Sequence, residues 1–439
     1  MNTKILREEF ESQIAQLPGE AHERNLRRKA MEAFHHTGFP NRQWEAWRYT
    51  DLKPITSSIF QPIPKEPPDN THATAHTLLT SYGLETEPLR LVFLGGHYVA
   101  ALSSEAAQPG LELSTLDRAW PENCSALSER SSKQFSEHPL AALNTAFTTQ
   151  GAWIRVAEKA NIEPTMHLVF LDSNLDHQAP QPRILIDLKA EASLTVVKHF
   201  LSTGSTRGWT NLVTEVSQAQ GSKLTLYQFQ EHGTEHFHTG LFSSKLADSA
   251  SIKLGYIDLG GQLTRNDIHV DLAAPGARAE LFGVFLASHG QHVDNHTRID
   301  HRAPETTSVE TFRGIIGERG RGVFNGKVVV HPNAQKVDAQ QRSDNLLLSE
   351  KAEIDTKPEL EIYADDVKCS HGATVGDLDA EQLFYMQSRG VEDATARRIL
   401  TLAFANDILK LIGLPRLRER VILSVTDHLS GHEKLDTRP

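Results

Sequence analysis

The sequence predicts a mainly β protein whose core is a β-helix, with α-helical parts at both ends. Three observations predict this fold class. From about Leu91, short strings of Leu and β-branched residues are broken by Gly, Asp, Asn and Pro, a pattern typical of strands joined by turns. Within this region apolar positions recur every 28 to 30 residues. Before residue 85 and after Cys369, the apolar residues follow helical spacing instead.

Two interleaved series of apolar residues define the repeat. The first series, at intervals of 28 to 30 residues, comprises Leu194, Leu224, Ile252, Leu281, Val309 and Val337. The second series, at intervals of 28 or 29 residues, comprises Val213, Leu241, Val270, Ile299 and Val328. Two strand positions per repeat indicate stacked units that bury their apolar faces on their neighbours. Two strands are too few for a propeller blade, which favours a β-helix, and a β-sandwich with regular hairpins is the remaining alternative.

The N-terminal part is expected to be helical. Ile5, Phe10, Ile14 and Leu17 fall near one helical face, and after the interruption at Pro18 and Gly19 the pattern resumes over residues 21–34. Residues 44–52 follow, and then a proline-rich passage that suits neither regular element and is predicted to be an extended connector. We therefore expect three parts: an N-terminal helical domain with its connector (1–85), a β-helix core (86–375) and a C-terminal helical domain (376–439).

Three helices are expected after Cys369. Asp379 and Gln382 resemble a capping box for the first helix, which Gly390 ends. The second helix, residues 393–412, carries a broad apolar stripe from Ala396 to Leu411, and the third covers residues 417–429. The three helices are predicted to form a small bundle or a docking surface for a partner.

The charge and the cysteine content exclude several classes of protein. The 439 residues include 45 basic and 56 acidic side chains, and the net charge of −11 argues against a broad surface for nucleic acid or anionic membrane. Two cysteines, Cys124 and Cys369, are too few to cross-link a chain of this length, and the charged start lacks the apolar core of a signal peptide. No apolar run is long enough to span a bilayer. A cytoplasmic location is the natural inference.

Cys369-Ser370-His371 is the sharpest local feature. In an extended strand, residues two apart point to one face, so the thiol and the imidazole could together bind a soft or borderline metal. A stable zinc or iron-sulfur site usually has four protein ligands, and this chain has no second cysteine nearby. A structural cysteine beside a surface histidine and a nucleophilic Cys-His pair are the alternatives from spacing alone.

Two other patterns are weaker. His289, His292, His296 and His301 have spacings that suit helical metal ligands, but the surrounding residues read as strands, which favours a solvated polar face. Residues 322–328 are similar to a P-loop only loosely, because the first glycine is one residue too close and Val328 stands where Ser or Thr is needed. If ATP matters to this protein, a partner must hydrolyse it.

Several longer runs identify a family. The chain resembles the SufB/SufD family of iron-sulfur cluster assembly proteins in Glu310–Gly314, Phe324–Lys327, Gln340–Arg342, Asn345–Ser349, Lys357–Gly376, Leu383–Tyr385 and Ser388–Gly390. The element Trp47–Leu52 resembles the N-terminal part of the SufD branch. The octapeptide Cys369–Gly376 and the two cysteines in total also indicate the SufD branch, because SufB-like chains carry an acidic residue near the histidine and more cysteines.

The resemblance implies a fold and partners. It implies a right-handed parallel β-helix between helical ends, and a SufBCD complex in which SufC is the ATPase. In such a complex this chain would be a non-catalytic scaffold subunit that pairs with SufB. His371 and Cys369 would lie at the SufB interface, with His371 as a candidate ligand of a nascent iron-sulfur cluster that is transient and shared with SufB. Whether a reduced flavin binds is left open.

Two further expectations follow from these assignments. Because a solenoid end exposes unpaired backbone groups, the isolated chain is expected to form a homodimer or to aggregate. The rival function is an independent β-helix enzyme that acts on a polymeric substrate with paired carboxylates such as Asp365 and Asp366, although neighbouring strand residues point to opposite faces. Co-purification with an ATPase would discriminate between the two functions.

Overall fold

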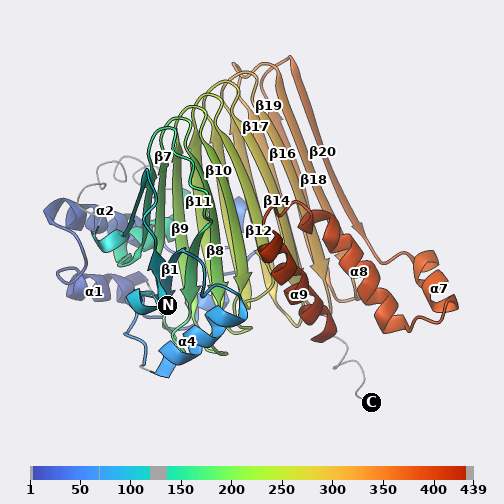
Figure 1. The fold of residues 1–439 in the computed structure, drawn as a ribbon, viewed down its shortest axis with the longest axis horizontal. Coiled ribbons are helices and arrows are strands. Elements are labelled where there is room, and N and C mark those ends of the chain that lie inside the picture. The colour runs from blue at the N-terminus through green and yellow to red at the C-terminus, as the bar shows by residue number, and fades with distance from the viewer. Residues whose placement is uncertain (1–2, 69, 119–134, 136, 432–439) are drawn as a thin grey trace.

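Two parallel β-sheets stack face to face to form a solenoid (Figure 1). The computed structural model describes residues 3–431 except 69, 119–134 and 136. The larger sheet runs in the order β2-β1-β6-β8-β10-β12-β14-β16-β18-β20, with β3 also paired to β1. Its strands are β1 Leu89–Leu94, β2 His97–Tyr98, β3 Ser104–Glu105, β6 Met166–Leu171, β8 Ser193–Leu201, β10 Lys223–Glu231, β12 Ser251–Asp258, β14 Arg278–Ala287, β16 Thr307–Ile316, β18 Val337–Leu347 and β20 Val367–Gly376.

The smaller sheet alternates with the larger one along the chain, in the order β19-β17-β15-β13-β11-β9-β7-β5-β4. Its strands are β4 Leu111–Thr115, β5 Gly151–Val156, β7 Arg183–Leu188, β9 Trp209–Gln218, β11 Phe237–Leu246, β13 Leu263–Leu272, β15 His292–His301, β17 Arg321–Val330 and β19 Glu353–Ile362. Each turn of the solenoid therefore contributes one strand to each sheet. This confirms the predicted mainly β fold, a parallel β-solenoid between helical ends.

The two apolar series fall on different sheets, as two strands per repeat requires. Leu194, Leu224 and Ile252 are direct neighbours in the larger sheet, and Val270, Ile299 and Val328 are direct neighbours in the smaller one. Other members are displaced from these rows: Leu281 pairs with Leu254 and stays in the interior, whereas Val309, Val213 and Leu241 point outward. Glu310, not Val309, pairs with Leu281, so Val309 points outward and is 40% exposed. Leu241 pairs with Asp267 and packs outward against Ala141. A slip by an odd number of residues reverses the face of a strand residue.

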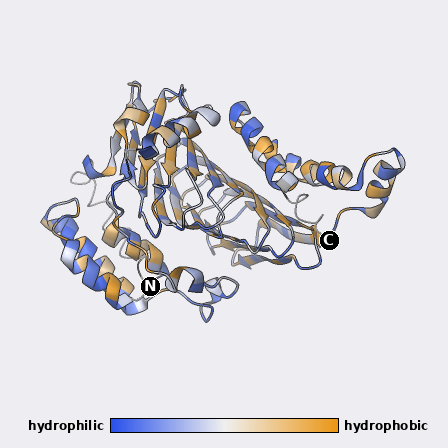
Figure 2. Ribbon diagram, turned by 90° about the horizontal axis from the view of Figure 1, so that it is seen from below, coloured by the Kyte–Doolittle hydropathy of each residue, from blue (hydrophilic) through white to orange (hydrophobic). Residues whose placement is uncertain are grey.

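The interior of the solenoid is a column of side chains from alternate strand positions. Figure 2 shows hydrophobic and hydrophilic residues interspersed along the strands. Phe93, Phe170 and Phe200 stack on successive strands with ring centroids 5.0 and 4.9 Å apart. Such in-register ladders bury large apolar area in every turn, which is the main stabilisation available to a solenoid.

The first turns of the solenoid are closed by antiparallel strands. On the side away from β6, β1 pairs with the short strands β2 and β3. In the other sheet β4 pairs antiparallel with β5. These strands reverse the direction of the chain and occupy hydrogen-bonding groups that another parallel strand would need.

The N-terminal helices lie on two faces of the solenoid (Figures 1 and 2): the first helices pack against the smaller sheet, and the helix Asn70–Ser81 packs against the larger one. They are α1 Thr3–Gln13, α2 Ala21–Thr37, the 3₁₀ helix η1 Glu45–Trp47, α3 Lys53–Thr56, α4 Asn70–Ser81, the 3₁₀ helix η2 Ala100–Leu102 and α6 Pro139–Phe147. Glu20 and Glu23 form a reciprocal capping box at the start of α2. The prediction of an extended connector is wrong at α3 and α4. Pro54 stands in the first turn of α3, where the ring is tolerated, and α4 begins after the last proline of the passage.

The segment around Trp47 is fastened to the outer face of the smaller sheet. The Arg265 guanidinium lies 4.1 Å from the Trp47 ring centroid, and its Nη1 is 2.5 Å from Asp294 Oδ2. The Thr50 hydroxyl also donates to Asp294 and lies 2.7 Å from His292 Nε2. Burial alone would raise the pKa of Asp294, but Arg265 and His296 hold it well below its ordinary value. The element that resembles the family's N-terminal part therefore has a packing role.

The C-terminal helices are α7 Ala380–Ser388, α8 Asp393–Leu409 and α9 Pro415–Gly431, and each begins within two residues of its predicted start. The Asp379 side chain accepts hydrogen bonds from the Glu381 and Gln382 amides. The three helices do not form the predicted separate bundle. Ile408 of α8 and Val421 of α9 pack on the outer face of the larger sheet, in one cluster with Phe229. The outer face of the larger sheet is apolar too, and it covers much of the apolar stripe of α8, for which the sequence indicated no packing partner.

The predicted domain boundaries at residues 85 and 375 stay a prediction. Among the described residues, no helix combines the length and the apolar character that crossing a bilayer requires.

Candidate functional site

The site begins at the C-terminal end of the solenoid, where the strands are no longer covered by a further turn. Within the described part of the chain, β20 pairs with β18 alone and β19 with β17 alone. Each last strand therefore has one edge of backbone N–H and C=O groups without a strand partner. We call this end, formed by β19 and β20, the open end.

Cys369 and His371 both lie on β20, at the open end. In register they stand beside Ala339 and Gln341 of β18, whose side chains are buried in the interior. Register neighbours in a parallel sheet point to the same face, so the thiol and the imidazole both point to the inner side of the solenoid. Cys369 is partly buried against the core and His371 is exposed. The shared face expected from their spacing is therefore present.

The thiol of Cys369 is held in its neutral form. Burial raises its pKa, and a backbone hydrogen bond at Ala339 only partly opposes this shift. A neutral thiol is a poor nucleophile, and it becomes a ligand when a metal ion displaces its proton. Among the described residues, no three His, Cys, Asp or Glu side chains form a group that could hold a metal ion.

A hollow of about 380 Å³ lies beside His371. Its lining includes Glu310, Gln341 and His371, which are consecutive neighbours in one row across β16, β18 and β20. Gln341 donates a hydrogen bond of 2.5 Å from Nε2 to Glu310 Oε2. Burial raises the pKa of Glu310 to about 7, against the opposing effect of that hydrogen bond. Sequence reasoning missed Glu310 and Gln341, although both lie in the runs that identified the family.

The carboxylates of the rival enzyme are not in a strand. Asp365 and Asp366 are exposed in the turn between β19 and β20. The Asp366 amide donates to Gln335 Oε1 and its carbonyl accepts from the Lys336 amide, so this residue joins two successive turns of the solenoid. The sequence placed them on a strand because the run around them is strongly β-forming.

The four histidines between 289 and 301 are scattered, as the strand pattern predicted. His289 lies in a turn and contacts Glu318. His292 touches Thr50, and burial lowers its pKa to about 4. His301 is fully buried between Thr306 and Ser308. The expectation of a solvated face is therefore wrong for His292, His296 and His301: the N-terminal segment covers His292, His296 is 9% exposed beside Asp294, and the solenoid interior encloses His301.

The stretch that loosely resembled a P-loop is part of strand β17. Gly326 stands where an added Cβ atom would come within 2.2 Å of Gln341 Nε2. Glycine at this position therefore makes room for the Gln341 side chain. Residues 322–328 form part of a strand and not a phosphate-binding loop, as expected from the sequence. Cys124, the second cysteine, lies outside the described residues.

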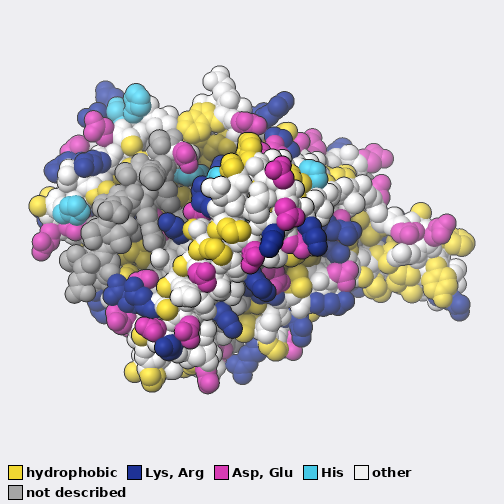
Figure 3. All heavy atoms as spheres, turned by 90° about the horizontal axis from the view of Figure 1, so that it is seen from above, with side chains coloured by type: hydrophobic (Ala, Val, Ile, Leu, Met, Phe, Trp, Pro, Cys, Tyr) yellow, Lys and Arg dark blue, Asp and Glu magenta, His cyan; other side chains and the backbone are white. Residues whose placement is uncertain are grey.

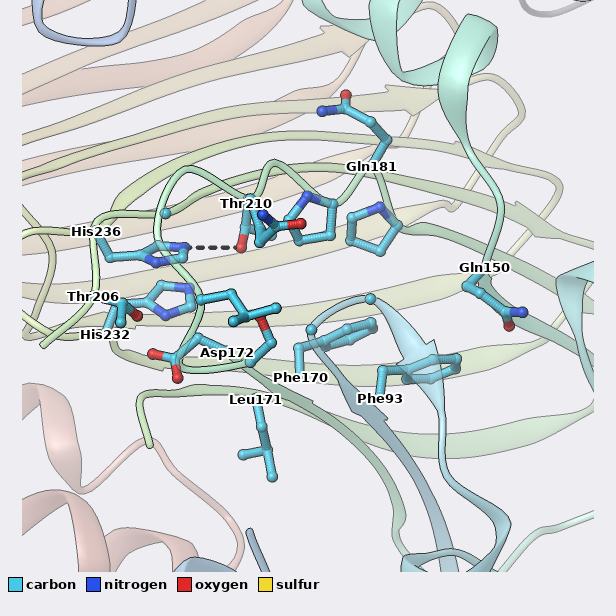
Figure 4. A pocket seen from close by; sticks show the side chains of 18 of the residues that line it. Phe93, Gln150, Phe170, Leu171, Asp172, Gln181, Thr206, Thr210, His232 and His236 are labelled. Atoms are coloured by element: carbon cyan, nitrogen blue, oxygen red, sulfur yellow. Dashed lines mark hydrogen bonds between the residues drawn. The ribbon is translucent and has the colours of Figure 1, made fainter. Parts of the chain in front are cut away.

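A second set of histidines was missed altogether. His232 and His236 border a cavity of about 30 Å³ in the turns near β10 and β11, with Asp172 opposite (Figure 4), and the His238 ring lies 5.6 Å from that of His232. The His232 and His236 rings stack 3.9 Å apart, and His236 Nε2 lies 3.0 Å from the Thr210 hydroxyl. Burial lowers the pKa of His236 to about 4 and holds the pKa values of His232 and His238 well below their ordinary value. Three histidines within seven residues were the available signal.

These features define a class of protein: a two-sheet parallel β-solenoid, closed at one end, with a cysteine-histidine pair at the other. The chain matches two family descriptions, "SUF system FeS cluster assembly, SufBD core domain" over residues 170–404 and "SufBD protein N-terminal region" over residues 8–168. The chain belongs to the SufB/SufD family of iron-sulfur cluster assembly proteins.

Similar proteins agree with this assignment. The iron-sulfur cluster assembly protein SufD of Escherichia coli is 31% identical over 404 residues, which cover 90% of each chain. The SufBD family protein slr0076 of Synechocystis is 29% identical and covers 90% of this chain and 89% of its own. SufD of Bacillus subtilis is 26% identical over 65% of this chain and 66% of its own. The resemblance to the SufD branch is thereby confirmed.

Proposed function

We propose that this chain is a non-catalytic scaffold subunit of a cytoplasmic SufBCD complex, in which it pairs with SufB to form an interfacial site for a nascent iron-sulfur cluster. The observation that carries the proposal is the position of Cys369 and His371, on the last strand of the open end. Side chains on this strand would contact any partner that covers the open end.

The open end is suited to pairing with another solenoid. Its two free strand edges offer hydrogen-bonding groups to a further strand, which is the usual way in which a sheet is extended by a partner. Ile354 and Leu360 of β19 are partly buried hydrophobics at the end of the core, and Val375 of β20 is 48% exposed. A second β-solenoid of the same family would bury these groups. Without SufB, a second copy of this chain is expected to take its place.

Pairing also explains how two ligands could suffice. An iron-sulfur cluster is commonly bound by four side chains, and centres with histidine in place of cysteine are known. The pair Cys369 and His371 would supply part of the set, and SufB the remaining thiolates. The cluster is cargo in this proposal, held until an acceptor takes it.

Replacing His371 with Ala should lower the iron and the sulfide bound per purified SufBCD complex several-fold, with the complex intact. His371 is exposed, so its truncation should cost little folding stability. Cys369→Ala should lower loading less if SufB supplies the main thiolate. His76→Ala, at an exposed position of α4, is the matched control and should load like the wild type. Unchanged iron and sulfide in the His371 variant would remove this residue from the site.

SufC is proposed to dock on α7. Phe384 and Tyr385 are 72% and 59% exposed, and Figure 3 shows hydrophobic side chains gathered on the projecting tip that contains this helix. The exposed Ile399 extends the apolar surface onto α8. Ile408 of the α8 stripe is buried on the sheet, whereas α7 and this edge of α8 present exposed apolar side chains that a partner could cover.

Changing Phe384 and Tyr385 together to Asp should weaken retention of SufC at least about tenfold, because exposed aromatic anchors commonly dominate an interface. Pull-down and titration with purified SufC would measure this. Ile59→Asp, at a site that is 67% exposed and distant along the chain, is the matched control and should retain SufC fully. Full binding by the double variant would place the docking site elsewhere and leave the SufB pairing untouched.

A further inference from the structure

The cavity beside His232 and His236 is bordered by buried polar atoms that lack hydrogen-bond partners. Among the residues that the structure describes, none hydrogen-bonds to either ring nitrogen of His232, to Nδ1 of His236, to Oδ2 of Asp172 or to Oγ of Ser173. These four side chains line the cavity of about 30 Å³, and Figure 4 shows both rings and the carboxylate around it. His232, His236 and Ser173 are at most 5% exposed. Buried polar groups without partners are costly, so the cavity should hold an occupant.

The Asp172 carboxylate lacks a cationic partner among the described residues that line the cavity, since these include no Lys or Arg. Its Oδ1 atom accepts hydrogen bonds from the amide and the hydroxyl of Thr203, whereas Oδ2 is buried without a donor. Burial lowers the pKa values of His232 and His236, although the charge of Asp172 acts to raise that of His236, so neither ring supplies a positive charge near pH 7. A buried negative charge without a partner is destabilising, and a small cation would remove this cost.

The size and the bonding pattern of the cavity select the ion. A particle of the size of a water molecule needs about 10–15 Å³ of such a cavity, which therefore has room for about two of them. The described His, Cys, Asp and Glu side chains form no group of three that could hold a metal ion, which disfavours a transition metal. A potassium ion is commonly bound by oxygen atoms and would leave the ring nitrogens unpaired. An ammonium ion is similar in size to water, and its four N–H groups can donate to both a carboxylate oxygen and imidazole nitrogens.

We propose that this cavity is a binding site for a single ammonium ion, which donates hydrogen bonds to Asp172 Oδ2 and to one ring nitrogen each of His232 and His236. The buried Oε1 atom of Gln150 also lines the cavity, has no donor among the described residues, and is a further acceptor for the ion. The remaining space suits a water molecule bound by the Ser173 hydroxyl. The ion would link the segment before β5, the turn after β6 and the turn between β10 and β11.

The surroundings of His236 support its role as an acceptor. Its Nε2 atom lies 3.0 Å from Thr210 Oγ1, and a ring that donates its proton there keeps the Nδ1 lone pair for the ion. Gly208 also lines the cavity, and an added Cβ atom at Gly208 would come within 2.7 Å of His236 Nδ1. The space beside this nitrogen therefore depends on glycine at position 208.

The test compares ammonium chloride with potassium chloride and sodium chloride at equal ionic strength, using the purified full-length chain at about pH 7.5. Ammonium should raise the thermal unfolding midpoint by about 2 °C or more at saturation, because a ligand that binds only the folded state stabilises it. ¹⁵N-labelled ammonium should give one slowly exchanging proton signal per chain. Asp172→Asn keeps an acceptor for Thr203 and removes the charge, and it should weaken ammonium binding at least about tenfold. Asp377→Asn, at an exposed position, is the matched control and should bind like the wild type.

Three results would overturn the proposal. Wild-type ammonium binding in Asp172→Asn would remove the carboxylate from the site, and an equal rise of the midpoint in potassium chloride would remove the preference for ammonium. The absence of both an ammonium-specific rise and the ¹⁵N-coupled signal would mean that the cavity holds water only. If Asp172→Asn does not fold, His232→Phe takes its place, because it keeps a stacked ring and removes both nitrogens, and undiminished binding in it contradicts the site. None of these measurements depends on iron loading, so their outcome is independent of the proposed function.

Discussion

The protein should lose several kcal/mol of stability between pH 7.5 and pH 5.5. Burial lowers the pKa values of four histidines to about 4, those of His167, His236, His292 and His301. In the unfolded chain these groups titrate near 6.5, so between pH 6.5 and 4 the unfolded state binds more protons than the folded state. The stability that these four neutral histidines contribute is complete above pH 6.5 and is lost as the pH falls from 6.5 to 4. At pH 5.5 each histidine should lower the free energy of unfolding by about 1.4 kcal/mol.

Other groups modify the size of this effect. His199, His232 and His238, whose pKa values burial also holds well below the ordinary value, add to the loss. Asp258 and Glu310 oppose it, because burial raises their pKa values to about 7 and the folded state then gains protons as the pH falls. At pH 5.5 the two carboxyl groups together should raise the free energy of unfolding by about 4 kcal/mol, which is less than the histidines lower it.

Urea denaturation at the two pH values measures the change directly. A variant with His232 and His238 both replaced by Gln should show a smaller drop, because two of the titrating rings are gone. His76→Gln, exposed on α4, should show the wild-type drop. Equal unfolding midpoints at pH 7.5 and 5.5 in the wild type would mean that these rings are not buried in neutral form.

Replacing Arg183 with Met should destabilise the fold by about 3–5 kcal/mol, the usual cost of leaving one member of a buried ion pair alone. Arg183 is 1% exposed, and its Nε and Nη2 atoms lie 3.0 and 2.8 Å from Glu215 Oε2. Its Nη1 donates to Asn144 Oδ1 and Thr145 Oγ1 of α6. The substitution thus leaves the buried Glu215 carboxylate without its cationic partner and removes two hydrogen bonds between α6 and the smaller sheet.

Two comparisons make this prediction specific. The Arg183→Met/Glu215→Leu double variant should recover most of the loss, since an apolar pair often replaces a buried ion pair at little cost. Arg342→Met removes a largely exposed guanidinium from Asp344, whose carboxylate keeps the Thr374 hydroxyl as a donor, and should cost at most about 1 kcal/mol. A urea midpoint for Arg183→Met close to that of Arg342→Met would contradict the structural role of the network.

The repeat could be predicted from the sequence because each turn of a solenoid buries residues at a nearly constant interval. Val270, Ile299 and Val328 are register neighbours as expected. The faces of Val309 and Leu241 could not be predicted, because a shift of one or three residues preserves the apolar character while reversing the direction. The helix α4 was missed because the prolines before it dominated the local pattern.

The site was predictable only in part. The spacing of Cys369 and His371 specifies a shared face once a strand is assumed, and that local inference needs no tertiary contacts. Glu310 and Gln341 join them through pairing of strands about 30 residues apart, and nothing in the local sequence states which residues will be in register. The histidines at 232–238 form a visible cluster in the sequence, but their burial near Asp172 of an earlier turn depends on how the turns of the solenoid stack.

The antiparallel strands at the start of the solenoid have a consequence for assembly size. A molecule with two bare ends could add copies without limit and grow into a filament, because head-to-tail contacts that do not close continue indefinitely. Here, among the described residues, the first end presents only the short antiparallel strands β2, β3 and β4, of two to five residues, in place of the ten-residue parallel edges of β19 and β20. Each chain is therefore a poor template for a third solenoid once it has joined a second one, and end-to-end growth is expected to stop at two.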